Sequence, residues 1–188
     1  MSNRLPIPSS NKSIVVLPFV NMSADPENEY FSDGITEEII NALTTVKGLK
    51  VIARTSSFAF KNKNIDVRTI GDQLGVSTVL EGSVRKAKSR VRITAQLIST
   101  NDGTHFWSKN FDRDLEDIFA LQDEISLNIA DQIRENFGHI NIQEHLIEAP
   151  TQNIEAYNLY LKGRYHHLMW DGPGIANAIE LYEQCIAI

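Results

Sequence analysis

Apolar positions near the start of the chain form a continuous run and then a helical period. Residues 14–17 are all apolar, and Pro18 closes the run. Such a run is typical of a strand that is covered on both faces. Asp25 and Pro26 then supply a helix cap and a first-turn proline. A helix is predicted from there, because apolar residues follow at spacings of three or four: Phe31, Ile35, Ile39, Leu43 and Val46.

Two shorter elements follow. Residues 49–53 alternate between apolar and other side chains, which predicts a second strand. Asp66 is predicted to cap a short helix that ends at Gly75. The order strand, helix, strand, helix predicts parallel neighbours in the sheet.

The middle of the chain carries the strongest strand pattern. Residues 78–85 predict one strand, residues 86–89 a turn and residues 90–97 a second strand with uninterrupted alternation. A turn at residues 101–103 (NDG) and a strand at residues 105–111 complete an antiparallel meander. A long helix is then predicted up to Phe137, with one apolar stripe: Ile118, Leu121, Ile125, Ile129 and Ile133.

The last part of the chain predicts a helical hairpin. The cluster at residues 171–174 (DGPG) separates two helical stretches. In the second stretch Ala178, Tyr182 and Cys185 share one face. The fold class predicted for the whole chain is therefore α/β (α+β): a mixed sheet of about five strands with packed helices, followed by this hairpin.

Composition narrows the class of protein. Apolar residues make up 42% of the 188-residue chain, which is enough for a packed core. The formal net charge of −6 argues against general binding to nucleic acid. Cys185 is the single cysteine, which excludes an internal disulfide and a cysteine-based zinc site. No apolar run reaches the length of a membrane span, and the start of the chain has no secretory pattern. A cytoplasmic location is expected, although a longer parent protein could be tethered to a membrane.

Several separated motifs resemble one known family. They occur in order at residues 14–19, 30–36, 51–57, 80–85, 90–94, 106–107 and 112–119. Together they resemble the TolB amino-terminal-domain-like module of bacterial signalling proteins. The resemblance implies a sheet domain akin to the anticodon-binding type, followed by tetratricopeptide (TPR) repeats. It also implies a neighbouring cyclase, winged-helix or kinase domain outside this chain, and it implies neither a catalytic site nor an established ligand.

The helical hairpin itself resembles a TPR repeat, with small and aromatic residues at corresponding positions. A hairpin of this kind needs stacked neighbours to bury its apolar face, so a longer parent protein is expected. The predicted organisation is a leader at residues 1–12, the TolB-like domain at 13–138, a linker at 139–150 and a truncated first TPR hairpin at 151–188. Its aromatic residues are candidates for protein contacts: Tyr157, Tyr160, Tyr165 and Trp170.

A small-ligand site is one hypothesis at the end of the second strand. Arg54, Thr55 and Ser56 follow that strand, and open α/β sheets place ligands at such strand ends. Asp33 precedes a glycine within the predicted first helix, which is compatible with a bound anion or with close helix packing. A serine–threonine turn with Arg54 in a structural ion pair explains the same residues.

A basic patch is a second hypothesis. Arg85, Lys86, Lys88, Arg90 and Arg92 lie on the predicted hairpin of an otherwise acidic chain. They could bind nucleic acid, anionic lipid or an acidic partner. Charged edge strands also prevent pairing with other chains, and the hairpin lacks the interleaved aromatic residues that favour nucleic acid.

The chain shows no pattern for metal binding, nucleophilic catalysis or a phosphate loop, so no cofactor and no metal are expected. The acidic residues around Asp25 are explained by the start of a helix. We therefore expect a non-enzymatic regulatory or sensory fragment that binds proteins or peptides through the TPR region, with an unidentified small ligand and a homo-oligomer as possible additions. Part of a cyclase-related enzyme and a nucleic-acid-binding regulator are the alternatives.

Overall fold

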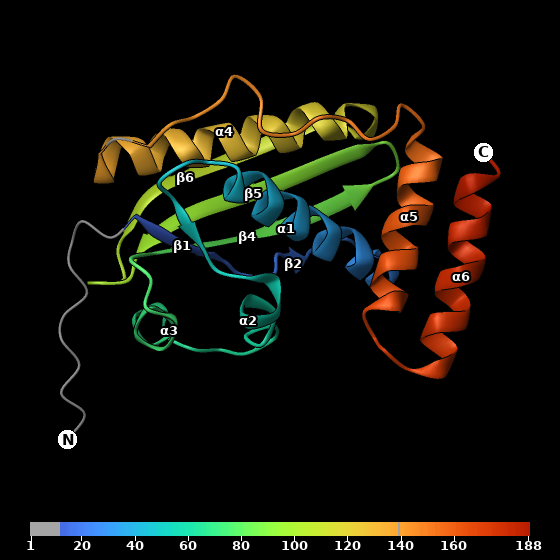
Figure 1. The fold of residues 1–188 in the computed structure, drawn as a ribbon, viewed down its shortest axis with the longest axis horizontal. Helices are drawn as coiled ribbons and strands as arrows, with labels where there is room; N and C mark the ends of the chain where they lie inside the picture. Colours follow the sequence, from blue (N-terminus) through green and yellow to red (C-terminus); the bar gives the residue numbers. More distant parts are fainter. Residues whose placement is uncertain (1–11, 139) are drawn as a thin grey trace.

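The computed structural model describes residues 12–138 and 140–188, which form a mixed sheet, helices packed on it and a terminal helical hairpin (Figure 1). The sheet order is β3-β1-β4-β5-β6, with the short β2 also paired to β4. The strands are β1 Ser13–Val16, β2 Val20–Asn21, β3 Lys50–Val51, β4 Thr78–Ala87, β5 Arg90–Ser99 and β6 His105–Asp114.

Strand directions agree with the sequence prediction. β1 runs parallel to β3 and β4, and β4, β5 and β6 form an antiparallel meander. The mixed α/β class is therefore confirmed. The described residues contain six strands and not about five, because the two-residue β2 is too short to leave a periodic pattern in the sequence.

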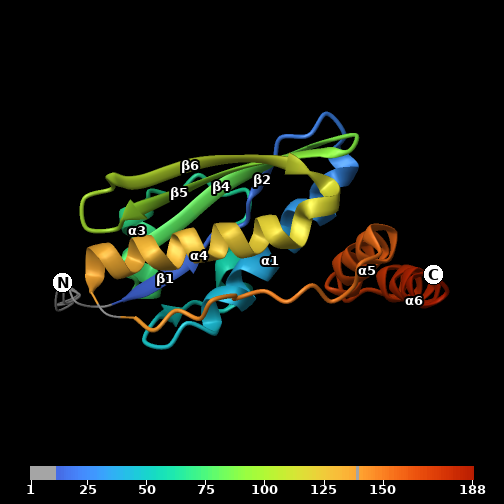
Figure 2. The same cartoon turned by 90° about the horizontal axis from the view of Figure 1, so that it is seen from above.

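The main core lies between the sheet and two long helices. Helices α1 Glu29–Thr44 and α4 Ile118–Phe137 cover the same face of the sheet (Figure 2). The inward positions of β5 are fully buried, as their alternation predicted: Val91, Ile93, Ala95 and Leu97. Burial of the valine, isoleucine and leucine side chains among them contributes about 1.5–3 kcal/mol each to the stability of the domain.

A smaller helix covers the other face of the first strands. Helix α3 Val67–Leu74 is capped by Asp66 and ends at Gly75, as predicted. Val15 on β1 packs with Ile70 and Val79 on this side, whereas its neighbours Ile14 and Val16 enter the main core. The continuous apolar run of β1 is therefore explained by cover on both faces.

The second predicted strand is shorter than expected. β3 contains Lys50–Val51 only, and Ala53 precedes a short helix, α2 Arg54–Phe58. Single-turn helices also precede α1 and α4, at η1 Pro26–Asn28 and η2 Leu115–Asp117. Elements of this length bury too few side chains to show a period.

The hairpin is attached to the α/β part through its first helix. It consists of α5 Ile154–His167, capped by Asn153, and α6 Gly172–Ile186, capped by Asp171. Helix α5 lies between α1 and α6, and its Tyr157 and Leu161 are buried in the main core. No helix among residues 12–138 and 140–188 is long and apolar enough to cross a membrane.

The segment between α4 and α5 is fastened along its course. Residues 140–150 pass along α4 and α1 towards α5 (Figure 2). The Asp123 carboxylate of α4 accepts hydrogen bonds from the N–H groups of Leu146 (2.7 Å) and Ile147 (3.0 Å), and it lies 2.8 Å from Nδ1 of His145. We call residues 140–150 the strap, because these bonds hold it against α4.

The bonds between Asp123 and the strap make the free energy of unfolding depend on pH. Burial raises the pKa of Asp123, but the bonds from His145 and the two N–H groups outweigh it and hold that pKa below its ordinary value. The same carboxylate raises the pKa of His145. The contribution of His145 to the free energy of unfolding is therefore complete below about pH 6.5, the pKa of histidine in the unfolded chain. It is lost as the pH rises through the raised pKa of His145 in the folded protein. The contribution of Asp123 to the free energy of unfolding is present above about pH 3.9, the pKa of aspartate in the unfolded chain. It is lost as the pH falls through the lowered pKa of Asp123 in the folded protein.

We therefore expect His145→Ala to lower the free energy of unfolding more at about pH 5.5 than at about pH 8.5. Urea unfolding of both proteins at the two pH values measures this difference. His105→Ala removes an exposed imidazole from β6 and serves as the control for the loss of an imidazole outside the strap. Equal effects of His145→Ala at both pH values would show that its imidazolium does not stabilise the strap.

Candidate functional site

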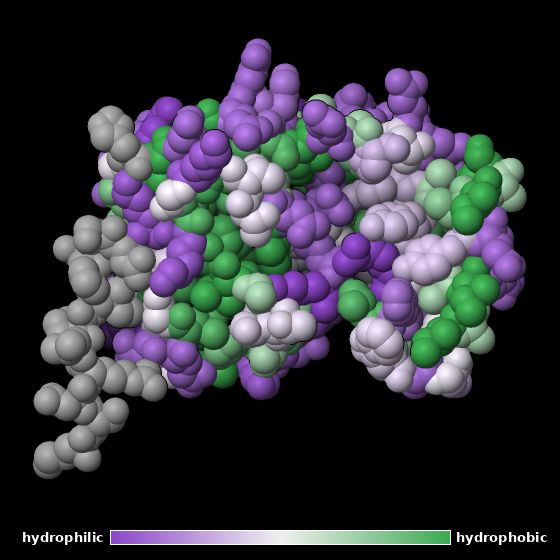
Figure 3. All heavy atoms as spheres, in the orientation of Figure 1, coloured by the Kyte–Doolittle hydropathy of each residue, from purple (hydrophilic) through white to green (hydrophobic). Residues whose placement is uncertain are grey.

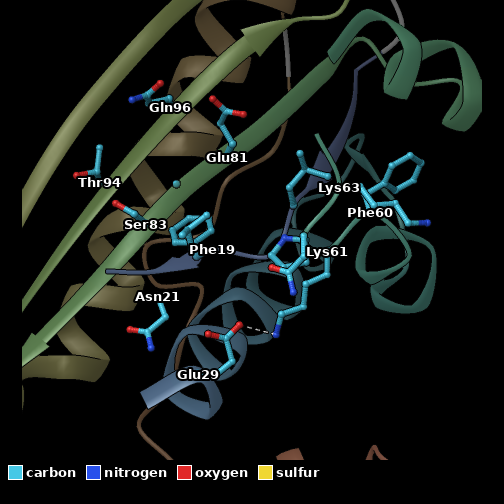
Figure 4. Close-up of a pocket in the computed structure, with 15 residues that line it drawn as sticks. Phe19, Asn21, Glu29, Phe60, Lys61, Lys63, Glu81, Ser83, Thr94 and Gln96 are labelled. Atoms are coloured by element: carbon cyan, nitrogen blue, oxygen red, sulfur yellow. Dashed lines mark ion pairs between the residues drawn. The ribbon is translucent and has the colours of Figure 1, made fainter. Parts of the chain in front are cut away.

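A cavity of about 550 Å³ opens beyond the carboxyl end of β1, where β2 takes over the pairing with β4 (Figure 4). Open α/β sheets bind ligands at such ends of parallel strands. One wall carries Glu81 and Ser83 of β4 with Thr94 and Gln96 of β5. The complete lining is Leu17, Pro18, Phe19, Val20, Asn21, Glu29, Phe60, Lys61, Asn62, Lys63, Glu81, Gly82, Ser83, Thr94 and Gln96.

The opposite wall comes from the segment that follows α2. Phe60, Lys61 and Lys63 line the cavity on this side, with the Lys61 side chain directed towards Glu29 and the Lys63 side chain directed away from the two strands (Figure 4). Asn62 adopts a left-handed conformation with φ of 58°, so the chain turns sharply between the two lysines. N–H groups of Lys61 and Lys63 donate to the carbonyls of Phe58 and Phe60, both at 3.1 Å, which fixes this turn.

The wall formed by β4 requires a glycine. A Cβ atom at Gly82 would lie 2.2 Å from the Thr94 carbonyl oxygen and 2.9 Å from Cε2 of Phe19. The carbonyl belongs to the paired strand β5 and cannot move aside without breaking the ladder. The buried Phe19 ring can therefore lie against the backbone of β4 and close the base of the cavity.

The predicted strand-end residues divide between two environments. Arg54 forms an ion pair with Glu37 of α1 and stacks over the Phe58 ring, 3.8 Å from its centroid. Thr55 and Ser56 are exposed on α2. The structure thus brings Arg54 and Asp33 to one face of α1, but it leaves the two hydroxyl residues in solvent. Arg54 is therefore part of a structural ion pair, which was the alternative to a ligand site at this strand end.

Asp33 is also committed to an internal pair. Its carboxylate oxygens lie 2.6 and 2.7 Å from Nζ of Lys61, which also contacts Glu29 at 2.8 Å. Burial raises the pKa of Asp33, and the hydrogen bond from Lys61 offsets part of that shift. Lys61 therefore joins α1 to the wall of the cavity.

Glu37 belongs to the acidic segment that the sequence assigned to the start of a helix, and its role as an ion-pair centre was not predicted. It is 5% exposed, and besides Arg54 it binds Nη2 of Arg164 on α5 at 2.8 Å. Arg164 also donates to the Tyr160 hydroxyl at 3.1 Å. We call Glu37, Arg54 and Arg164 the Glu37 cluster. It links α1, α2 and α5, and next to it Leu161 packs against Gly34, where a Cβ would be only 2.7 Å from Cδ2 of Leu161.

The predicted basic hairpin is largely compensated by acidic residues. The β5–β6 register places Asp112 opposite Arg92 and Asp114 opposite Arg90. Arg92 binds Asp112 at 2.7 and 3.0 Å, while Arg90 pairs with both aspartates. Alternation along β6 could have revealed this charge ladder in the sequence.

The other three basic residues have separate surroundings. Lys86 extends over the Phe31 ring and donates to Asn158 of α5 at 3.3 Å, and burial lowers its pKa. Nε of Arg85 donates to the Met22 carbonyl at 3.3 Å, and Lys88 is exposed in the turn. The five residues thus do not form one uncompensated basic surface.

The aromatic candidates of the hairpin also differ in environment. Tyr157 is 2% exposed, accepts a hydrogen bond from Nε2 of Gln122 at 2.9 Å, and has a pKa raised by burial. Tyr160 and Tyr165 are half-buried, whereas Trp170 is 73% exposed in the turn before α6. Tyr157 therefore serves internal packing, and Trp170 remains available to a partner.

No group of three or more histidine, cysteine, aspartate or glutamate side chains that could hold a metal ion occurs within the described part of the chain.

Cys185 donates its thiol hydrogen to the Ala156 carbonyl, with a distance of 3.2 Å.

Comparison with known proteins adds family information. A family model described as HilA/YgeH-like transcriptional regulator, second domain, matches residues 10–128. The chain is 45% identical over 176 residues to "Putative adenylate cyclase 3" of Rhizobium meliloti (strain 1021). This match covers 94% of the chain, which spans only 30% of the length of that relative.

Solved structures to which this chain is similar include TolB, a lipoprotein and an LpoB domain. TolB from Acinetobacter baumannii is 13% identical with a TM-score of 0.48, covering 65% of this chain and 28% of its own. Lipoprotein GNA1162 from Neisseria meningitidis is 16% identical with a TM-score of 0.47, and the match covers 66% of this chain and 95% of that protein's chain. The LpoB C-terminal domain from Salmonella enterica is 16% identical with a TM-score of 0.46, and the match covers 55% of this chain and 83% of that protein's chain. These likenesses concern the fold alone, and the TPR resemblance of the hairpin stays a prediction.

The Glu37 cluster generates a stability prediction. Glu37→Gln leaves Arg54 and Arg164 facing each other without a carboxylate. Because both arginines keep some contact with solvent, we expect the free energy of unfolding to fall by about 1–3 kcal/mol. Urea unfolding near neutral pH measures this change.

Glu38→Gln is the matched control, because Glu38 adjoins Glu37 on the same helix and is attracted by Arg164 but forms no salt bridge within 4 Å among the described residues. Burial raises the pKa of Glu38, so removal of its charge is expected to change stability by no more than about 0.5 kcal/mol. Equal losses in the two variants would contradict a specific role for the cluster.

Proposed function

We propose that this chain, which belongs to the HilA/YgeH-like transcriptional regulator family through that family's second domain, is a non-catalytic regulatory module that acts by protein contact. The observation that carries the proposal is an exposed apolar ridge on α6. Ile175, Ile179 and Ile186 are 40%, 54% and 85% exposed and lie on one face of that helix. Contiguous exposed apolar surface commonly marks an interaction site.

The ridge is held in a defined position. Helix α6 packs on α5, and α5 is fixed to α1 through Leu161 and the Glu37 cluster. Hydrophobic residues gather on the outer side of α6 (Figure 3). A ridge carried by a hairpin fixed in this way loses little conformational freedom when a partner binds, which favours its use as a recognition surface.

Contacts within the hairpin support its interpretation as a TPR repeat. Gly163 of α5 allows Tyr182 of α6 to approach closely, since a Cβ at this glycine would lie 2.5 Å from Cε1 of the ring. Ala178 is buried beside it, so small and aromatic residues mesh between the helices. In TPR arrays the outer face of such a hairpin is covered by the next one. The proposed occupant of the ridge is therefore a further helical hairpin of the same polypeptide.

A regulatory role without catalysis agrees with the state of the buried acids. Asp33 and Glu37 are each neutralised by a cation, and Asp123 accepts N–H donors from the strap. General acid–base or metal-dependent chemistry would need carboxylates directed at a substrate. Transcriptional or cyclase output is accordingly assigned to domains outside this chain, in line with the 30% coverage of the cyclase-like relative.

One test concerns catalysis directly. The purified chain, incubated with ATP and either Mg²⁺ or Mn²⁺, is expected to form no cyclic AMP above the buffer level. Mass spectrometry of the nucleotide products measures this. Product formation that Asp33→Asn or Glu37→Gln reduces would overturn the non-catalytic assignment.

A second test concerns the ridge. If the hairpin is a TPR repeat, a consensus TPR hairpin appended after Ile188 should stack on α6 and slow its amide hydrogen exchange. Ile179→Lys in the same fusion should abolish that protection, because it places a charge in the stacked face.

Asn177→Lys is the control for this fusion, since it adds the same charge to the opposite, exposed face of α6. Protection of α6 should persist in this variant. Fast exchange of α6 in the unsubstituted fusion would show that the hairpin does not stack as a TPR repeat does.

A further inference from the structure

We propose that a small dianion, namely inorganic phosphate or the phosphate group of a small phosphate monoester, binds between Lys86 of β4 and Lys162 of α5. This inference stands apart from the protein-contact role of the ridge on α6. It rests on the position of the two ammonium groups where the helical hairpin meets the α/β part, and on the partners that they have there.

Lys86 carries a positive charge into this contact, where β4 ends beside α5 (Figure 1). Its Nζ lies 4.8 Å from the centroid of the Phe31 ring and 5.7 Å from that of the Tyr30 ring. The same ammonium group donates to Oδ1 of Asn158 at 3.3 Å and to the Tyr30 hydroxyl at 3.4 Å. Because hydrogen bonds from N–H to oxygen are usually about 2.7–3.2 Å long, both acceptors bind this group weakly.

Other half-buried cations of the molecule are bound by a carboxylate. Arg54 and Arg164, for example, both form ion pairs with Glu37. Lys86 is also half-buried, yet it forms no ion pair with any residue that the structure describes. Burial of an ammonium group removes water from it, and the cost is high where no opposite charge takes the place of that water.

Lys162 adds a second positive charge at the same aromatic ring. It is exposed on α5, one helical turn after Asn158, and its Nζ lies 5.3 Å from the centroid of the Tyr30 ring. Burial lowers the pKa of Lys86, and repulsion from the ammonium group of Lys162 lowers it further. Lys162 likewise has no ion pair among the described residues. The two charges therefore oppose the attachment of α5, and an anion between them would strengthen it.

The acidic start of α1 does not neutralise this pair. Lys162, but not Lys86, borders a hollow of about 440 Å³ that three acidic residues also line: Asp25, Glu27 and Glu29. The Asp25 carboxylate caps η1 by accepting the N–H of Glu27 at 2.9 Å, and Glu29 binds Lys61 at 2.8 Å. Asp25 and Glu27 are exposed, so water and salt screen their effect on an anion bound at Lys86.

The number of charges and donors favours a phosphate group. One dianion neutralises both lysines, whereas chloride or acetate neutralises only one. Each ammonium group has three N–H donors, of which Lys86 uses two in long bonds. The Tyr30 hydroxyl, whose own bond to Asn158 is 3.5 Å long, can donate as well. Phosphate oxygens accept several such bonds at once, and these charge-assisted bonds are stronger than neutral ones.

Isothermal titration of the full chain with inorganic phosphate tests the inference. The titration is made at about pH 8, where phosphate groups are doubly charged, with chloride added to hold the ionic strength constant. Glycerol 3-phosphate is the second probe, and the tighter of the two identifies free phosphate or a monoester as the ligand. Acetate carries one charge and is expected to bind about tenfold more weakly or worse.

Lys86→Met and Lys162→Met examine the two residues separately, since methionine keeps an unbranched side chain and removes the charge. Each substitution is expected to weaken phosphate binding about tenfold or more, the effect of a lost charge-assisted hydrogen bond. Lys50→Met is the control. It removes a charge from an exposed position on β3 that also has no ion pair within the described part of the chain, and it should leave binding unchanged.

Urea unfolding gives a second readout. In chloride buffer without phosphate, both contact variants should unfold at a urea concentration no lower than the unsubstituted protein, because each removes a repulsion between like charges. Phosphate should raise the midpoint of the unsubstituted protein by mass action and leave the midpoints of the two variants unchanged. Lower midpoints of the variants without phosphate, combined with no phosphate effect on the unsubstituted protein, would show that Lys86 serves its aromatic contacts alone.

Three binding results would also overturn the proposal. They are the absence of binding by both phosphate probes at millimolar concentration, acetate binding as tight as phosphate binding, and a loss of affinity in Lys50→Met equal to that in the two contact variants. The comparison of phosphate with acetate uses the unsubstituted protein, so it does not depend on the folding of any variant.

Discussion

The need to neutralise the buried carboxylate of Glu37 governs how the two parts of the molecule fit together. A carboxylate that is 5% exposed is tolerated only with charged partners. Here those partners are Arg54, which follows β3, and Arg164, which lies on α5. One group on α1 thus binds both the start of α2 and the middle of α5.

Helix α1 acquires two different faces for this reason. Phe31, Ile35 and Ile39 enter the core beneath the sheet, as the apolar period predicted. On the reverse face, Asp33, Gly34 and Glu37 bind the segment after β3 and the helical hairpin. The period predicts the first face well, because burial against a sheet demands apolar residues at regular spacing.

The second face could not be predicted in the same way. The sequence analysis drew attention to Asp33, Gly34 and Arg54. It explained the acidic residues around them by the preference for negative charge at the start of a helix, and so it did not predict their ion pairs. Which cation neutralises which carboxylate depends on pairs far apart in the chain, such as Glu37 and Arg164, and no local period encodes them. The meander of β4, β5 and β6 was predictable because neighbouring strands are joined by short turns, whereas β2 and α2 are too short to carry a pattern. The cavity was missed because the side opposite β4 and β5 comes from the short β2 with the residues before it and from the turn after α2.

The position of Lys61 has a mechanical consequence. This side chain lines the cavity and at the same time holds Asp33, one helical turn from Glu37 and hence from the contact with α5. A fourteen-residue helix such as α5 is about 21 Å long. Its contacts with α1 lie in the short stretch from Tyr157 to Arg164, so a change in the tilt of α1 would move the ends of α5 more than its middle. Lys61 thus connects the charge at the cavity to the face of α1 on which α5 packs.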